Sequence, residues 1–372
     1  MTDTRQGATI WQGDAPHGGF RESIAVRPLY VPHPPSLALL YGDIENHALL
    51  QHKVFVGTAG SVNERSNAAG FRFYAHQYYD GDGKKRETYI AGPIGAPEVE
   101  AVLDALRERI RDTQELVPSL RLLGREGFHL VDRKTYATLA AIHNHHLFAG
   151  GAVLIGSHAF GVLLNRLAAR ATPYATEDID IARRQELAIA SATKVTLLDI
   201  LRESGIAFFE VPGFAPNAPA TSFKEQGRSR FHVDLLVPSP DESFPILPVP
   251  ELGAHAIGLP YLDYLIEESQ LAALLSREGA CTVRVPLPER FAIHKLIVSQ
   301  LRSGRSAKSE KDIHQATVLS AVLAKHHPGA LEDAVSQVPR HAVRHLKMGL
   351  QLAKPILELR APQAWEALQD LP

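Results

Sequence analysis

Three aspartates in two apolar segments are the residues best suited to chemistry. Asp178 and Asp180 stand two positions apart in segment 176–181, and Asp234 lies in segment 230–237. Side chains at i and i+2 of a strand share a face, so Asp178 and Asp180 are expected to point the same way. Adjacent carboxylates in an apolar segment are costly unless a cation lies between them. A divalent metal is the usual partner, and such sites commonly serve phosphoryl or nucleotidyl transfer.

A glycine–serine pair predicts a phosphate site ahead of these aspartates. Gly156 and Ser157 follow the apolar run 152–155 and precede a helical pattern. Glycine lets the backbone approach a ligand closely, and the N-terminus of a helix favours phosphate. No Gly-Lys-Ser/Thr follows, which excludes a Walker A loop. Neither this pair nor an Asp-x-Asp is specific alone; their order along the chain carries the prediction.

The elements that must position these residues form a predicted α/β core over residues 149–258. In segment 230–237, Phe231, Val233, Leu235 and Val237 alternate with His232 and Asp234, so Asp234 is expected on the face opposite to the apolar side chains. The core is also expected to contain a helix over 185–201, a strand over 208–211 and a proline-containing loop over 212–227.

The rest of the chain divides into four predicted regions. They are an irregular lead-in over 1–45, a small β-hairpin region over 46–93, a helical connector over 94–148 and a C-terminal helical domain over 259–372. The hairpin is expected over 71–79 and 84–90, with a third strand over 54–62. Helices are expected over 97–123, 134–147, 261–276, 288–303, 309–324, 329–336 and 340–357, with a short strand over 282–285. The fold class is therefore α/β, in the broader sense α+β.

Basic and aromatic residues alternate in the predicted hairpin, which allows two interpretations. The mixture could stack on and neutralise a nucleic acid. It could instead be a small sheet with solvated basic edges, which block edge-to-edge pairing; we favour this second interpretation. The basic residues are Arg65, Arg72, Lys84, Lys85 and Arg86.

Composition indicates the general class of protein to which the chain can belong. The 372 residues carry a net charge of −2 and 45% hydrophobic residues, typical of a globular protein of about two or three domains. No overall field draws such a chain to nucleic acid or membrane, although a local basic patch is compatible with this charge. One cysteine, Cys281, excludes an internal disulfide. No signal-like or membrane-spanning run is present, so we expect a cytoplasmic protein with no membrane partner.

Two lysines in the predicted helical domain form a further candidate feature. Lys295 lies on the helix expected over 288–303, and Lys311 with Asp312 begins the next helix. A lysine here could neutralise a nucleoside triphosphate. The alternative is an ordinary solvated helix face.

The combined pattern resembles the DNA polymerase β-like nucleotidyltransferase superfamily over about residues 149–315. The matching motifs are Gly156-Ser157, Asp178-Ile179-Asp180 and His232-Val233-Asp234, and the stretch from Pro288 to Asp312 is similar to the helical part of bacterial nucleotidyltransferase-fold proteins. Some of these are toxins of toxin–antitoxin pairs, including distant AbiEii-like proteins. The resemblance implies a polymerase β-like core with a mixed sheet. It also implies metal-dependent transfer of a nucleoside monophosphate from an NTP, ATP among them, to an acceptor.

The resemblance also implies residue roles. Gly156 and Ser157 would hold the triphosphate, and Lys295 would contact phosphate. Asp178, Asp180 and Asp234 would be the catalytic, metal-binding residues for two Mg²⁺ ions, with Mn²⁺ as a substitute, and Asp234 would also help activate the acceptor hydroxyl. Lys311 and Asp312 would lie near the nucleotide or acceptor. His158 departs from the family, in which smaller or apolar residues are common after Gly-Ser.

Several alternatives stay open at this level. The acceptor could be an RNA end, a protein or a small molecule, and an antitoxin could be a partner. The chain could also be a catalytically silent nucleotide- or nucleic-acid-binding module. A strongly basic groove beside the site would favour a nucleic-acid acceptor. A closed small pocket would favour a metabolite.

Overall fold

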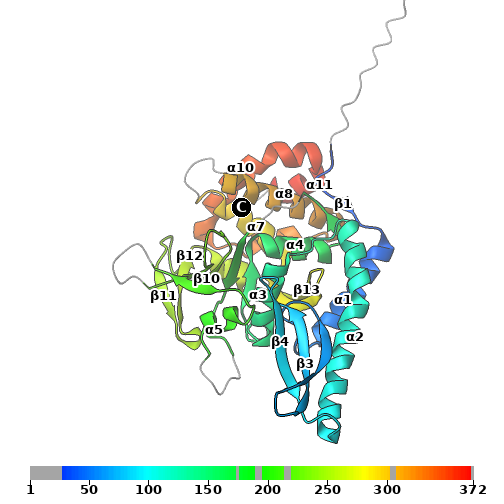
Figure 1. Cartoon of the computed structure of the whole chain (residues 1–372). Helices are drawn as coiled ribbons and strands as arrows, with labels where there is room; N and C mark the ends of the chain where they lie inside the picture. Colours follow the sequence, from blue (N-terminus) through cyan, green and yellow to red (C-terminus); the bar gives the residue numbers. More distant parts are fainter. Residues whose placement is uncertain (1–26, 173–175, 189–194, 213–218, 302–306, 370–372) are drawn as a thin grey trace, which may run out of the picture.

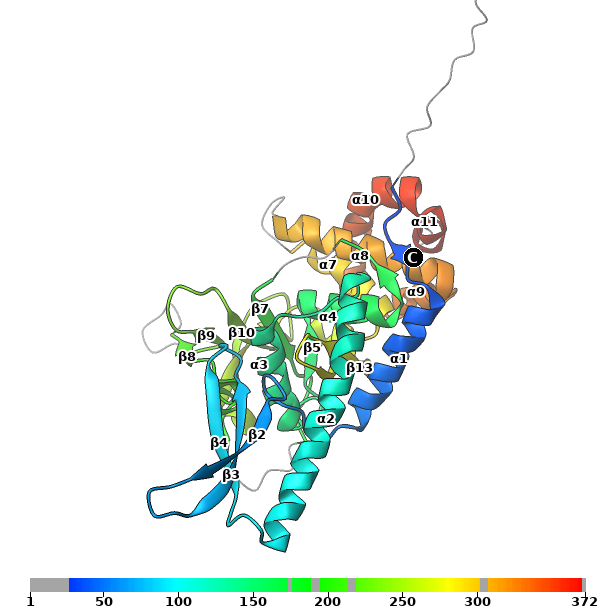
Figure 2. The ribbon, with the colours of Figure 1, turned by 45° about the vertical axis from the view of Figure 1, so that its right-hand side comes forward.

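The computed structural model describes residues 27–172, 176–188, 195–212, 219–301 and 307–369. A mixed β-sheet occupies the middle of the molecule, and the C-terminal helices cover one end of it (Figure 1). At the opposite end, a three-stranded sheet lies alongside one long helix, as both views show (Figure 2). The architecture is α/β, as the sequence predicts.

The central sheet has seven strands of mixed direction. β10 pairs in parallel with both β7 and β12, whereas the pairs β5–β7, β11–β12, β9–β10 and β8–β9 are antiparallel. The strand order is β11-β12-β10-β7-β5, with β9 beside the first half of β10 and β8 beyond it. The bounds are β5 Val153–Ile155, β7 Asp178–Ala182, β8 Phe208–Val211, β9 Ser222–Glu225, β10 His232–Pro238, β11 Ile246–Val249 and β12 Ala254–Leu259.

The alternation of β7 and β10 sends apolar side chains into the core and polar ones to the other face. Ile179, Ile181, Val233 and Leu235 are all buried. The acidic and histidine positions between them are partly exposed. Because the two strands are in parallel register, the polar positions of one strand lie beside those of the other.

Helices and smaller sheets surround this centre. On the N-terminal side lie β1 Val31–Pro32, α1 Pro35–Leu50, β2 Ser61–Ser66, β3 Arg72–Tyr79, β4 Lys85–Ala91, α2 Pro97–Arg125, α3 Arg133–Asn144, α4 Gly156–Arg166, β6 Ala169–Arg170 and α5 Leu197–Arg202. On the C-terminal side lie α6 Leu262–Ile266, β13 Ser269–Leu275, β14 Ala280–Pro286, α7 Pro288–Val298, α8 Ala307–His326, α9 Ala330–Ser336, α10 Val343–Arg360 and α11 Pro362–Gln369.

Most predicted elements are confirmed. The hairpin β3–β4, the helices α2 and α3, the strand–helix unit β5–α4 and the strands β7, β8, β10 and β14 lie where the sequence predicts them. The predicted C-terminal helices correspond to α7, α8, α9 and α10, and α11 is an additional helix. The third strand of the hairpin sheet was predicted too early, since β2 begins at Ser61.

Four predictions are wrong in part. The lead-in contains helix α1, and its residues 1–26 lie outside the described ranges. Of the helix predicted over 185–201, residues 185–188 are not helical and 189–194 are outside the described ranges. Helix α5 begins at Leu197 because Thr196 and Asp199 form a capping box. The loop predicted over 212–227 contains strand β9, and its residues 213–218 are not described.

The fourth correction concerns the helix predicted over 261–276. Helix α6 ends at Ile266, and Ser269–Leu275 is strand β13, paired along its whole length with β14. Alanine and leucine favour helix in this stretch, but pairing with β14 satisfies the backbone of a segment that is mostly buried. The predicted C-terminal helical domain therefore also contains a two-stranded sheet.

The basic residues of the hairpin sheet are largely engaged in ion pairs. Arg65 contacts Glu87 at 2.7 Å, Arg72 contacts Glu64 at 2.8 Å, and Arg86 contacts Asp80 at 2.6 Å. These contacts agree with the interpretation of a small sheet whose charged edge residues pair with one another.

One large hydrophobic cluster joins the central sheet, α3, α4 and the C-terminal helices. Two smaller clusters lie between α1, α2 and the β13–β14 sheet, and between the hairpin sheet and α2. Helices α7 and α10 approach closely, because a Cβ added to Gly349 would lie 2.1 Å from the Leu296 carbonyl oxygen. None of the described helices combines the length and apolar character needed to cross a membrane.

This close approach generates a stability prediction. Gly349→Ala should lower the free energy of unfolding by about 1–3 kcal/mol, because the added methyl group overlaps backbone of α7. Gly42→Ala in α1 is the matched control, since a Cβ there meets nothing within 4 Å. The control should gain up to about 1 kcal/mol from higher helix propensity. Urea unfolding of both variants checks this, and equal midpoints would contradict the packing at Gly349.

Candidate active site

The three predicted aspartates gather on one face of the central sheet. Asp178 and Asp180 lie on β7, and Asp234 lies on β10 directly beside Asp180 in the parallel register. The side chain of Asp178 is 42% exposed and that of Asp234 27% exposed. The carboxylates of Asp178 and Asp234 are thus accessible from outside, while the strands are buried on the other face.

A histidine that sequence reasoning left without a role lies between two of these carboxylates. His232 Nδ1 is 3.4 Å from Asp178 Oδ1, and its Nε2 is 3.5 Å from Asp234 Oδ2. The hydrogen bond to Asp234 is the largest of the effects that raise the pKa of His232 to about 9. The imidazole is therefore a cation at neutral pH. The sequence contained one signal for this placement, because His232 stands two residues before Asp234 and therefore on the same face of the strand.

The pKa of Asp180 shows that this concentration of negative charge destabilises its ionised form. Burial and, after it, the nearby Asp234 carboxylate raise its pKa to about 6, although Lys295 opposes the shift. A carboxyl group destabilised as an anion by burial and by like charge is a group that a bound cation would stabilise.

Helix α4 begins against Asp180. Gly156 has a φ of +70°, and a Cβ at this position would lie 2.1 Å from Asp180 Oδ2, so both backbone and space require glycine. Ile155 is the N-cap residue and gives the first turn no side-chain hydrogen bond. The buried hydroxyl of Ser157 lies 3.5 Å from Gln315 Nε2 on α8. The predicted phosphate loop therefore adjoins the aspartates.

The charged residues of α7 and α8 also face the site. Lys295 and Asp312 are both buried and form an ion pair of 2.6 Å, so Lys295 does not lie on a solvated helix face. Burial and the neighbouring Lys295 lower the pKa of Lys311, and the negative charges of Asp312, Asp178 and Asp180 partly offset this. Lys295 and Lys311 thus lie within electrostatic range of the aspartates, and Asp312 interacts with both lysines.

Ser222 is a second site residue that the sequence did not indicate. Its hydroxyl donates a 2.5 Å hydrogen bond to Asp234 Oδ1. It lies on β9, within the stretch predicted to be a loop. Antiparallel pairing with β10 places Ser222 directly beside Asp234, and sequence spacing alone contains no signal for such a pairing.

The donor set fits a divalent cation in its chemistry. Mg²⁺ takes carboxylate oxygens together with water and phosphate oxygens. Within the described ranges, no group of three or more His, Cys, Asp or Glu side chains is arranged to hold a metal ion. The His232 ring stands between Asp178 and Asp234, so a metal held by both carboxylates requires this ring to turn aside.

Comparison with known proteins gives a family match. A family model described as "Nucleotidyltransferase" matches residues 133–339, which include all the residues above. No curated protein matches the chain. A solved structure from Paracoccidioides brasiliensis, an antigenic nucleotidyltransferase-like protein, is 18% identical, with a TM-score of 0.27. The match covers 53% of this chain and 84% of that one.

The ion pair of Lys295 and Asp312 generates a prediction. Lys295→Met should lower the free energy of unfolding by about 3–5 kcal/mol, because it removes the closest cation from the buried Asp312 carboxylate. The double variant Lys295→Met/Asp312→Asn should recover part of this loss. Thermal unfolding followed by circular dichroism measures both. If the double variant is no more stable than the single one, the ion pair is not what Lys295 contributes.

Proposed function

The chain belongs to this nucleotidyltransferase family, and we propose that it moves a nucleoside monophosphate from an NTP to an acceptor hydroxyl with the help of a divalent metal. One observation carries the proposal. The parallel register of β7 and β10 places Asp180 beside Asp234, with Asp178 on the same face, directly next to the start of α4. Carboxylates of the kind that bind divalent metals then lie beside a helix N-terminus, which favours phosphate, and this supports the proposal.

In this proposal the chain's own residues bind and orient the triphosphate. The N–H groups at the start of α4, with the Ser157 hydroxyl, hold phosphate oxygens. Lys311 balances the negative charge of phosphates and aspartates, since it already lies in the field of Asp178 and Asp180. Lys295 acts mainly by positioning Asp312 and α8, because its amino group is engaged in the ion pair.

Asp178, Asp180 and Asp234 are the proposed ligands of two Mg²⁺ ions, with Mn²⁺ as a substitute. When bound, the metal supplies charge neutralisation for the attacking and leaving oxygens of an in-line displacement. The hydrogen bond from Ser222 fixes Asp234 Oδ1, while Oδ2 lies 3.5 Å from His232 Nε2.

In the proposed transfer, the acceptor oxygen forms a bond to the α-phosphorus of the NTP. The bond between this phosphorus and the α–β bridging oxygen breaks, and pyrophosphate leaves. The hydroxyl proton of the acceptor passes to the Asp234 carboxylate. Nucleotide and acceptor are the open choices. The antitoxin partner implied by the resemblance stays a prediction.

Asp178→Asn and Asp234→Asn should each reduce transfer by about 10³-fold or more, because metal clamping contributes several kcal/mol to the transition state. The assay incubates the protein with each α-³²P-labelled NTP and Mg²⁺ in the presence of cell RNA or lysate protein. Glu177→Gln is the matched control, since this exposed carboxylate neighbours Asp178 but precedes the strand. It should retain full activity.

Two results would overturn this assignment. Full activity in either aspartate variant would exclude the metal site. Saturable NTP binding without label in any acceptor fraction would favour the silent binding module instead.

Metal binding has a readout that is independent of activity. Mn²⁺ should raise the unfolding temperature of the wild-type protein, because it neutralises carboxylates that repel one another around Asp180. Asp180→Asn should unfold at a higher temperature than wild type without metal and should gain less from Mn²⁺. A thermal shift titration measures both effects. An equal gain in wild type and variant would contradict metal binding at Asp180.

A further inference from the structure

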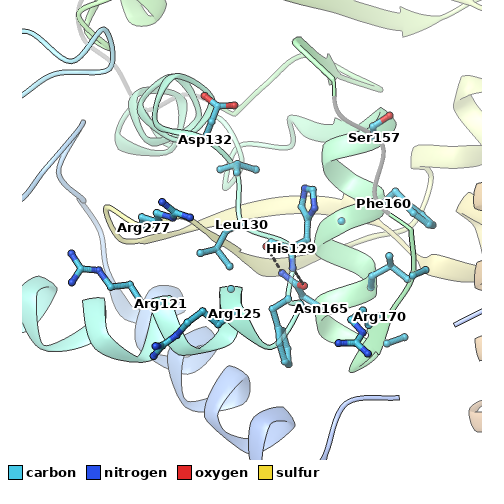
Figure 3. A pocket seen from close by; sticks show the side chains of 18 of the residues that line it. Arg121, Arg125, His129, Leu130, Asp132, Ser157, Phe160, Asn165, Arg170 and Arg277 are labelled. Carbon is cyan, nitrogen blue, oxygen red and sulfur yellow. Dashed lines mark hydrogen bonds between the residues drawn. The ribbon is translucent and has the colours of Figure 1, made fainter. Parts of the chain in front are cut away.

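A basic groove opens beside Ser157. Its volume is about 1330 Å³, and α2, the segment that follows it, α4 and the turn between β13 and β14 form its walls (Figure 3). A second cavity of about 610 Å³ shares Arg121, Arg133 and Arg277 with the first. The two therefore form one continuous feature, which we call the arginine groove. It extends from Ser157 toward Gly60.

Arginine dominates the charge of this groove. Five exposed arginines line it: Arg121, Arg125, Arg133, Arg170 and Arg277. Only two carboxylates accompany them, and each already has a structural role. Asp132 accepts hydrogen bonds from the first turn of α3, and Glu278 forms an ion pair of 3.0 Å with Arg133.

The other four arginines of the groove lack a carboxylate partner within the part of the chain that the structure describes. They are Arg121, Arg125, Arg170 and Arg277. The hairpin sheet differs, since Arg65, Arg72 and Arg86 there each contact one. In a protein with a net charge of −2, this local excess of positive charge attracts an anion from outside.

Size and spacing indicate what kind of anion fits. Pockets for small molecules commonly measure about 300–1,000 Å³, whereas this groove measures about 1330 Å³ and bears several cations. Arg121 and Arg125 lie one turn apart on α2, about 6 Å along the axis, and both line the groove. Repeated cations along one wall suit a chain of regularly spaced phosphates. A positively charged groove that follows the backbone is the way in which proteins commonly hold a single strand.

The groove also leads to the proposed reaction centre. Ser157 lines it at one end, and the preceding Gly156 touches Asp180. In Figure 3, Ser157 lies across the cavity from the arginines of α2 and the β13–β14 turn. A strand held by those arginines would bring one of its ends to the aspartates.

We propose that the arginine groove binds a single-stranded polynucleotide whose terminal hydroxyl is the acceptor of the transferred nucleotide. Binding of the strand stands on the groove alone. The use of its terminal hydroxyl rests on the proposed function. RNA and DNA share the phosphodiester chemistry that the groove recognises, so the test includes both.

The first experiment measures binding without catalysis. A fluorescein-labelled 12-nucleotide RNA, or DNA of the same sequence, is titrated with the full chain in EDTA and without NTP, and anisotropy is followed at several salt concentrations. Arg121→Glu and Arg125→Glu should each weaken binding at least about tenfold. Each should also reduce the slope of log K against log salt by about 0.7, the value for one lost phosphate contact on a single strand.

Arg111→Glu is the matched control for these variants. Arg111 is an exposed arginine of the same helix and lines neither cavity. It lies about 15 Å along the axis from Arg121, which exceeds the screening length of about 8 Å at physiological salt. The control should bind the strand within about twofold of wild type at that salt concentration. Circular dichroism confirms that all three variants fold.

The outcomes separate this inference from the proposed function. The groove assignment is wrong if wild type binds neither strand at low salt, or if the groove variants bind as Arg111→Glu does. The acceptor role of the strand is wrong if transfer to a protein or small molecule proceeds equally in groove variants and wild type. Asp178→Asn should bind the strand normally and fail to extend it. Strand binding by wild type without transfer from any NTP would refute the proposed function and leave the groove assignment intact.

Discussion

The parallel pairing of β7 and β10 concentrates negative charge, and the rest of the site compensates for it. The register sets Asp180 beside Asp234, and the two-residue period of a strand adds Asp178 on the same face. Burial and this proximity raise the pKa of Asp180 to about 6. The surrounding cations reduce the repulsion between the carboxylates. His232 lies between two of them, and Lys295 and Lys311 lie within their electrostatic range. A charge arrangement of this kind favours a bound divalent cation.

The helices hold this arrangement through short, specific contacts. Gly156 lets α4 start against the Asp180 carboxylate, where any side chain would collide. The buried pair of Lys295 and Asp312 connects α7 to α8, and Gln315 on α8 reaches back to Ser157. The C-terminal helices share one hydrophobic cluster with the central sheet. Movement of α8 would therefore alter both the charge around the aspartates and the start of α4.

Sequence reasoning predicted that the three aspartates share one face of the sheet because the signals for it are local. The alternation that sets Asp178 beside Asp180, and the strand–glycine–helix order at Gly156, both lie within a few consecutive residues. Ser222 could not be found this way, since its place beside Asp234 depends on pairing between segments separated by an unpredicted strand boundary. Strand β13 was misassigned for a related reason. Its alanines and leucines favour helix, and only the partner strand β14 decides otherwise.

The arginine groove depends on residues spread even more widely. Arg121 and Arg125 come from α2, Arg170 from β6 and Arg277 from the β13–β14 turn. Arg170 and Arg277 lie far along the chain from Arg121 and Arg125, and the net charge of the whole chain conceals them. The basic residues that do stand out in sequence, those of the hairpin, are mostly engaged in ion pairs already.

The position of α2 has a consequence for how such a protein can diversify. The family match begins at residue 133, so the aspartates, Ser157, Arg170 and Arg277 lie within it, while Arg121 and Arg125 precede it. The groove thus lies between the part of the chain that matches the family model and the helix α2 that precedes it. Changes in α2 can reshape one wall of the groove without altering the residues that surround Asp180. Under the proposed function, variation or deliberate exchange of α2 is a route to new acceptors that leaves the proposed chemistry in place.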